Sequence, residues 1–225
     1  MVSVSNVPGN CREFSKTPPS SVVVLAIESA QNALVSPVTH FFIGWALANS
    51  APSLDKRERA LVTWAGVVPD LDGLGIIADR LTRNSAHPLN WWGEYHHTLC
   101  HNLGFAMVVA IMAAVLARQK LKTTILVFIS FHLHLIGDLV GARGPDGDQW
   151  PIPYLLPFSK SMYLVWSGQW ALNAWPNMVI TAMLIGFALM WARQRGFSPL
   201  EMISTRVDAG FVRAIRARFP LRAAG

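Results

Sequence analysis

The sequence is short of charge, of cysteine and of a recognisable leader. Only 14% of its 225 residues are charged, whereas a soluble domain carries about 25%. The two cysteines, Cys11 and Cys100, lie in unlike contexts and provide no disulfide framework. The first 20 residues lack the basic start and apolar core of a cleavable signal peptide. These shortages argue against a disulfide-stapled secreted domain and favour a membrane protein.

Several catalytic signatures are also missing. The chain has no G-x-S-x-G, no P-loop, no G-x-G-x-x-G and no internal repeat. No serine or cysteine is paired with a base in a recognisable way. The sequence therefore gives no support to a serine hydrolase, a P-loop enzyme or a dinucleotide-binding enzyme.

Apolar segments and tryptophan are abundant instead. The chain is 52% hydrophobic and contains nine tryptophans, which are enriched at bilayer interfaces. Thr98–Ala117 and Thr123–Ala142 are uncharged or nearly so over 20 residues, and Pro176–Ala192 is uncharged over 17, close to the roughly 20 that a spanning helix needs. The shorter runs His40–Ala51 and Ala60–Val68 suit a helical hairpin. We expect an all-α integral membrane helical bundle with about three transmembrane helices plus this hairpin.

Composition divides the chain into three parts. Residues 1–37 form an N-terminal extension rich in Ser and Pro, which we expect to be disordered or interfacial. Residues 38–192 form the membrane-embedded domain. Residues 193–225 form a basic cytoplasmic tail, which we expect to lie on the anionic inner leaflet. A nucleic-acid-binding arm is the alternative reading of the tail, but no nucleic-acid partner is expected, because the basic residues are not interleaved with aromatics.

The basic residues predict the topology. Residues 56–59, residues 118–122 and the tail hold three, three and seven of the 19 Lys and Arg residues, and each segment lies beside an apolar run. If all three are cytoplasmic, eight histidines and aspartates that played no part in this assignment fall near the outer face. They are His40, Asp70, Asp72, His96, His97, His101, His134 and Asp138.

These side chains have the chemistry of a metal site. His134 and Asp138 are four apart in one span, so they share a helix face, whereas His132 points elsewhere. His97 and His101 have the same spacing. Imidazole and carboxylate donors without a thiolate suit zinc, manganese or iron, and the set exceeds what one ion needs, so we expect one or two divalent ions. The simpler alternatives are interfacial histidines, a single His–Asp hydrogen bond that ties two helices together, and a turn at Pro69–Gly73.

Four motifs, in order, resemble a bacterial family of inner-membrane metal-dependent hydrolases, the YdjM type. They are Thr39-His40, Pro69-Asp70-Leu71-Asp72, His96-x4-His101 and His134-x3-Asp138, followed by a Gly/Pro/Trp-rich loop at 144–151. The resemblance covers roughly residues 38 to 160. It implies a metal-ligand set of His40, Asp70, Asp72, His96, His101, His134 and Asp138, with Asp72, His96 and Asp138 as catalytic candidates.

Two residues depart from the family pattern. The family commonly has His-Arg where this chain has His96-His97, and a hydroxyl residue where it has Cys100. Helix spacing favours His97 as the partner of His101, whereas the family pattern favours His96. We take His96 as the ligand and His97 as a residue that supports a ligand or contacts the substrate.

The His134-x3-Asp138 element is also similar to zinc-dependent phospholipase C and the P1-type nucleases. This similarity implies phosphoester hydrolysis by metal-activated water. A membrane location then suggests a lipid or lipid-linked phosphoester as substrate and membrane lipids as partners. We expect a multi-pass protein of the bacterial inner membrane with its site on the periplasmic side. The alternatives are a proton-coupled transporter that uses His134 and Asp138 as a relay, and a non-catalytic assembly protein that acts through its tail.

Overall fold

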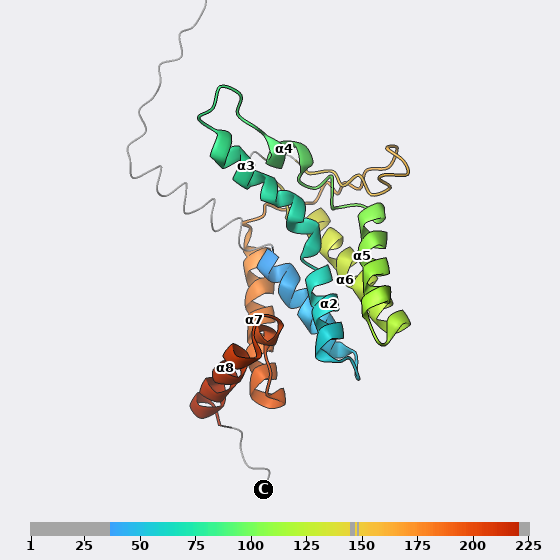
Figure 1. Ribbon diagram of the computed structural model, residues 1–225. Helices are drawn as coiled ribbons and strands as arrows, with labels where there is room; N and C mark the ends of the chain where they lie inside the picture. The colour runs from blue at the N-terminus through green and yellow to red at the C-terminus, as the bar shows by residue number, and fades with distance from the viewer. Residues whose placement is uncertain (1–36, 145–146, 148, 221–225) are drawn as a thin grey trace, which may run out of the picture.

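The computed structural model describes residues 37–144, 147 and 149–220, and residues 1–36 of the N-terminal extension lie outside them. Within this part of the chain the structure is helical, with no named strand and two isolated β-bridges after residue 141, which confirms the predicted all-α class. Residues 37–50 are helical, and the elements that follow are α2 Lys56–Ala65, η1 Val68–Leu74, α3 Gly75–Thr82, α4 Trp91–Tyr95, α5 Leu103–Leu116, α6 Lys120–Gly141, α7 Trp175–Arg195, η2 Pro199–Met202 and α8 Thr205–Arg218 (Figure 1).

Helix α6 packs against both α5 and α2. The α5 residues buried in the protein are all alanines, Ala106, Ala110 and Ala113, and small side chains let membrane helices approach closely. One core cluster joins Ala113 to Val127 of α6 and Val62 of α2. The 37–50 helix and α2 form the expected hairpin, and together these helices hold α6 on several sides.

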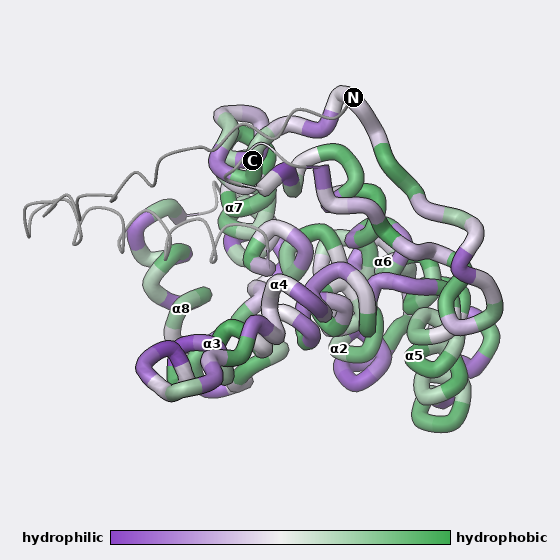
Figure 2. Tube along the Cα trace, turned by 90° about the horizontal axis from the view of Figure 1, so that it is seen from above, coloured by the Kyte–Doolittle hydropathy of each residue, from purple (hydrophilic) through white to green (hydrophobic). Residues whose placement is uncertain are grey.

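Among the residues that the structure describes, two helices are long and apolar enough to cross a membrane, α6 with 22 residues and α7 with 21. A third span is available if α2 and the following segment Val68–Thr82, bent by 51°, count as one. Exposed side chains on α5 and α7 are largely apolar, for example Ile111 and Met183, and Figure 2 shows α5 as hydrophobic along most of its length. An apolar exterior of this kind fits a bilayer rather than water.

The predicted span Thr98–Ala117 is shorter than expected. Helix α5 begins only at Leu103, because the Asn102 side chain caps it by accepting a hydrogen bond from the Phe105 N–H at 2.9 Å. Its 14 residues extend over about 21 Å at 1.5 Å per residue, less than the roughly 30 Å of a hydrocarbon core. The residues before Leu103 form an irregular segment instead.

The three basic segments meet at one end of the bundle. Arg59 forms a two-pronged ion pair with Glu201 at 3.1 and 2.8 Å, which joins α2 to η2. Lys122 donates to the Pro52 carbonyl, and the Gln119 N–H donates to Glu58. In Figure 1 the start of α2, the α5–α6 turn and α8 lie at the lower end, while α3, α4 and the loop after α6 lie at the upper end.

Candidate metal centre

Four segments far apart in the sequence bring their polar side chains together. The 37–50 helix supplies His40, η1 supplies Asp70 and Asp72, the irregular segment before α5 supplies His96 and His101, and α6 supplies His134 and Asp138. On α6, His134 and Asp138 lie one turn apart and are both buried. Pro69 lies in the first turn of η1, whose 3₁₀ form brings both of its aspartates to this site.

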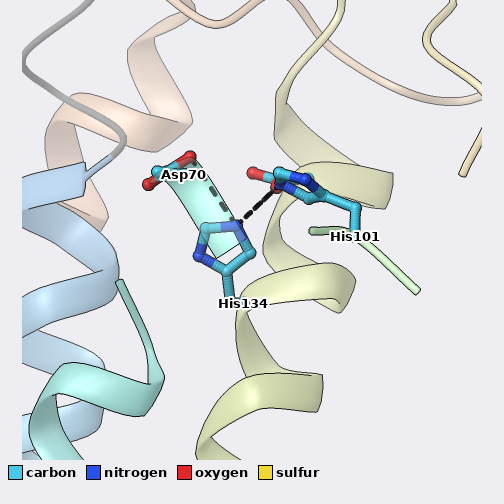
Figure 3. A group of neighbouring side chains, drawn as sticks. Asp70, His101 and His134 are labelled. Atoms are coloured by element: carbon cyan, nitrogen blue, oxygen red, sulfur yellow. Dashed lines mark hydrogen bonds and ion pairs between the residues drawn. The ribbon is translucent and has the colours of Figure 1, made fainter. Parts of the chain in front are cut away.

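The centre of the cluster is formed by Asp70, His101, His134 and Asp138. One ligand atom from each lies within 4.8 Å of the others, a grouping that could hold a metal ion. The His134 Nε2 lies 2.9 Å from Asp138 Oδ2 and 3.7 Å from Asp70 Oδ1, and the His101 Nε2 lies 3.2 Å from Asp138 Oδ2. Figure 3 shows Asp70, His101 and His134 pointing toward one another from three different segments.

The far side of each central imidazole is fixed by an acceptor. His134 donates from Nδ1 to the Gly66 carbonyl at 2.9 Å, and His101 donates from Nδ1 to Asp72 Oδ2 at 3.0 Å. A carbonyl and a carboxylate only accept, so in the neutral rings both Nδ1 atoms carry the hydrogen and both Nε2 atoms carry lone pairs. These two Nε2 atoms lie 3.1 Å apart. Two lone pairs at this distance need a metal ion or a proton beside them.

The electrostatics are consistent with either occupant. Burial opposes charging of His101, but hydrogen bonds and charge from Asp138 and Asp72 outweigh it and raise the pKa of His101 to about 9. Without a cation, a proton therefore satisfies the site. A divalent ion would take the place of that proton, because a histidine ligand coordinates through its lone pair. The orientation of each ring by an acceptor behind it is a regular feature of metal-bound histidines.

The other expected ligands lie around this centre. His40 Nε2 lies 3.1 Å from Asp138 Oδ1, and its ring centroid is 3.9 Å from that of His134. Asp72 lies behind His101 rather than beside Asp70, and its Oδ1 also faces the Nδ1 of His96 at 2.9 Å. Successive residues of a 3₁₀ helix are 120° apart, so two aspartates separated by one residue point in different directions. The structure thus brings all seven expected residues together. Asp72 and His96 lie outside the central group of four, because Asp72 contacts His101 from behind and His96 contacts Asp72.

His97 contacts His101, although the two residues do not lie on a common α-helix. Residues 96–102 are not α-helical, and His97 has a left-handed φ of 64°. Its buried ring stacks on His101 at 4.5 Å between centroids and meets the Trp150 ring edge-on at 4.7 Å. Burial holds the pKa of His97 well below its usual value, so the ring is neutral. His97 therefore packs against a central residue rather than joining the central group.

Sequence reasoning missed three contributors. Trp92 stacks on His96 at 5.2 Å, and Trp150 packs against the same ring at 5.4 Å. Trp150 belongs to the Gly/Pro/Trp-rich loop, so its motif was visible although its contact was not. The Gly66 carbonyl is a backbone group and has no sequence signal.

Two residues stand outside the cluster. The His132 ring forms hydrogen bonds with the Phe128 carbonyl through Nδ1 and with the Tyr154 hydroxyl through Nε2, the latter at 2.9 Å. It lies on a different side of α6, as its spacing predicts. Cys100 contributes its backbone N–H, which donates to Asp72 at 3.0 Å. Burial and the Asp72 charge raise the pKa of the Cys100 thiol to about 11, so it is protonated at neutral pH and packs as a small side chain.

Comparison with known proteins adds one family. A family model described as YdjM inner membrane protein matches residues 35–207, more than half of the chain and a range that contains every residue of the cluster. No curated protein and no solved structure matches the chain, so the likeness to phospholipase C and P1-type nucleases stays an interpretation of one short motif. The apolar surfaces of α6 and α7 agree with a membrane location. The chain belongs to the YdjM inner membrane protein family.

Proposed function

We propose that this protein is a membrane-bound metal-dependent hydrolase that cleaves a phosphoester in a lipid or lipid-linked substrate. The observation that carries the proposal is the opposed pair of Nε2 atoms of His101 and His134, 3.1 Å apart, with carboxylate oxygens of Asp70 and Asp138 beside them. This nitrogen and oxygen donor set suits zinc, with manganese or iron as alternatives. One or two such ions would activate water and neutralise charge on a phosphoryl oxygen.

Each side chain has a part in this proposal. Asp138 bridges the group, because one oxygen faces His40 and the other faces His101 and His134. Asp72 holds His101 in the orientation that turns its Nε2 inward. The side chain of His96 is 14% exposed, against 5% or less for His40, His101 and His134. We therefore assign His96 to contact with the leaving group of the substrate.

The arrangement of charge supports a periplasmic site. The basic segments gather at one end of the bundle, and the positive-inside rule assigns that end to the cytoplasm. His134 lies 14 residues after Lys120 in α6, about 21 Å along the helix axis. This distance lies within the roughly 30 Å of a hydrocarbon core, so a site at this depth belongs to the outer half of the bilayer. We propose a multi-pass topology with the centre open to the periplasmic side.

The first test is metal content per chain after detergent purification without chelators. We expect about one or two equivalents of a transition metal in the wild type and a large loss in His101→Ala. His132→Ala is the matched control, since it removes a hydrogen-bonded histidine of α6 that lies outside the cluster. A wild type free of transition metal would sink the metal-centre proposal. Release of phosphate or headgroup from mixed lipids then tests the reaction.

A proton-coupled transporter is the second candidate, because the His134 Nε2 lies 2.9 Å from Asp138 Oδ2 within the candidate span α6. In that case His134 and Asp138 exchange protons across the bundle, and the protein needs no metal. It predicts pH-dependent flux in liposomes with no bound metal, whereas the hydrolase predicts bound metal and product release. A non-catalytic assembly protein predicts instead that truncation after Ala192 abolishes function and His101→Ala does not.

A further inference from the structure

A cavity lies beside the metal centre, between the 37–50 helix, α6 and the start of α7. Its volume is about 250 Å³. This is less than the roughly 300–1,000 Å³ of a site for a drug-sized ligand, so it has room for a segment of a chain rather than for a whole lipid. Most of its wall is aliphatic, formed by Ile43, Leu133, Ile136, Val140, Leu172 and Ile180.

Two polar side chains that line the cavity, Trp170 and Asn177, already have partners in the protein. The Trp170 indole N–H donates to the Asn177 carbonyl oxygen at 2.9 Å, and the Asn177 amide donates to the Gly141 carbonyl at 2.8 Å. The amide also donates to the Leu172 carbonyl at 2.8 Å. These groups are held in place and turned toward the protein. What the wall offers to an occupant is hydrocarbon, which favours an apolar ligand over a sugar or a nucleotide.

The cavity and the metal centre share a wall at His40. The His40 ring lines the cavity, and its Nε2 contacts Asp138 Oδ1 at 3.1 Å. Gly137 makes this position available, because a Cβ there would lie 2.7 Å from the His40 Cε1. Helix α6 therefore presents Asp138 to the metal centre and the neighbouring Gly137 face to the cavity. A ligand in the cavity would therefore lie against His40, next to the metal centre.

We propose that this cavity binds one hydrocarbon chain of a lipid phosphoester whose phosphate group lies at the metal centre. The inference rests on the hydrolase proposed above and specifies its substrate as a single-chain segment presented from the bilayer. Two observations identify the source of the chain. The cavity lies between α6 and α7, both of which are long and apolar enough to span a membrane, and Ile136 in its wall is 55% exposed on the outer surface. A water-soluble phosphoester would leave this apolar wall without a partner.

The test uses the full-length protein in detergent and a long-chain monoalkyl phosphate with a diazirine near the end of its chain. After illumination, mass spectrometry maps the labelled residues. The cavity-filling variant is Ile180→Trp. The matched control is Ile185→Trp, which makes the same substitution on the same helix at a residue that is 40% exposed and does not line the cavity. Ile43→Trp fills the cavity from the opposite wall and guards against a folding defect in one variant.

We expect labels on α6 and on residues 172–180 in the wild type and the control. In both cavity-filling variants labelling should fall about tenfold, the effect of losing burial of roughly two methylene groups. Metal content should stay unchanged. Equal labelling in the wild type and in well-folded Ile43→Trp and Ile180→Trp, or labels spread over the exposed face of α5, would overturn the chain site. Variant-sensitive labelling in a protein that holds no metal and releases no phosphate would refute the hydrolase while leaving the chain site standing.

Discussion

Replacing Asp72 by asparagine tests the metal centre without removing a central residue. The Asp72 carboxylate accepts three hydrogen bonds, from His96 Nδ1 at 2.9 Å and from His101 Nδ1 and the Cys100 N–H at 3.0 Å. Asparagine has nearly the same shape but only one oxygen. Either the amide N–H₂ takes the place of Oδ2 and faces the donors of His101 and Cys100, or it takes the place of Oδ1 and donates to the Nδ1 of His96, whose hydrogen must then move to Nε2.

Where the amide N–H₂ faces His101, the preferred tautomer of that ring shifts. If its Nδ1 can no longer donate, the ring gains by carrying the hydrogen on Nε2, which removes the inward lone pair. Loss of such an orienting partner typically weakens metal binding about 10- to 100-fold, which corresponds to about 1.4 to 2.7 kcal/mol. A larger loss, comparable to that of His101→Ala, would show that Asp72 itself binds the metal.

The assay is a zinc competition titration against a chromophoric chelator at fixed pH. Asp208→Asn is the matched control, because Asp208 is also a buried carboxylate that accepts two hydrogen bonds, from the Ser198 N–H at 2.8 Å and hydroxyl at 2.6 Å, in the tail region. We expect the control to retain the wild-type affinity. If Asp72→Asn binds zinc as tightly as the wild type, or if both variants weaken equally, the reasoning from tautomers is wrong.

Three further predictions concern packing, metal and the tail. Gly137→Ala places a methyl group 2.7 Å from His40 Cε1 and should lower the metal content. In the control Gly186→Ala the new methyl group meets nothing within 4 Å, so this variant should keep its metal and gain about 0.5–1 kcal/mol in stability. Equal metal content in the two variants would contradict this prediction. Removal of metal by a chelator should lower the melting temperature, and re-addition of zinc at about 100 times its Kd should restore about 2.7 kcal/mol; an unchanged melting curve would count against bound metal. Glu201→Gln breaks the pair with Arg59 and should cost about 1–3 kcal/mol in thermal unfolding with metal content unchanged, and a loss of metal would show that the tail and the centre are coupled.

Much of the site could be predicted from sequence because its parts obey simple periodicities. The four-residue spacing of His134 and Asp138 survives in α6, where both are buried on one face. The basic segments indicated which ends of the helices meet, since Lys and Arg avoid the hydrocarbon region. That charge argument grouped His40 with residues about a hundred positions later, and the structure places it against Asp138.

The remainder depends on local geometry that periodicity does not describe. A run of uncharged residues does not reveal where a helix starts, and the Asn102 cap shortens the predicted span by five residues at its N-terminal end. Helix spacing favoured His97 as the partner of His101, whereas residues 96–102 are not α-helical and His97 adopts a left-handed φ. The division of roles between Asp70 and Asp72 arises from the 3₁₀ form of η1, and the motif alone does not specify this form.

The break after α2 has a consequence for how this protein should be mutated. A continued α-helix would use the Gly66 carbonyl for the N–H four residues on, but the chain turns into η1, and the Asp70 N–H bonds to Val67 instead. The Gly66 oxygen is thereby released to accept from His134. One essential acceptor of the centre is therefore main chain, and an alanine scan cannot delete it. Only an amide-to-ester replacement of the peptide bond between residues 66 and 67, which weakens that carbonyl as an acceptor, would expose its contribution.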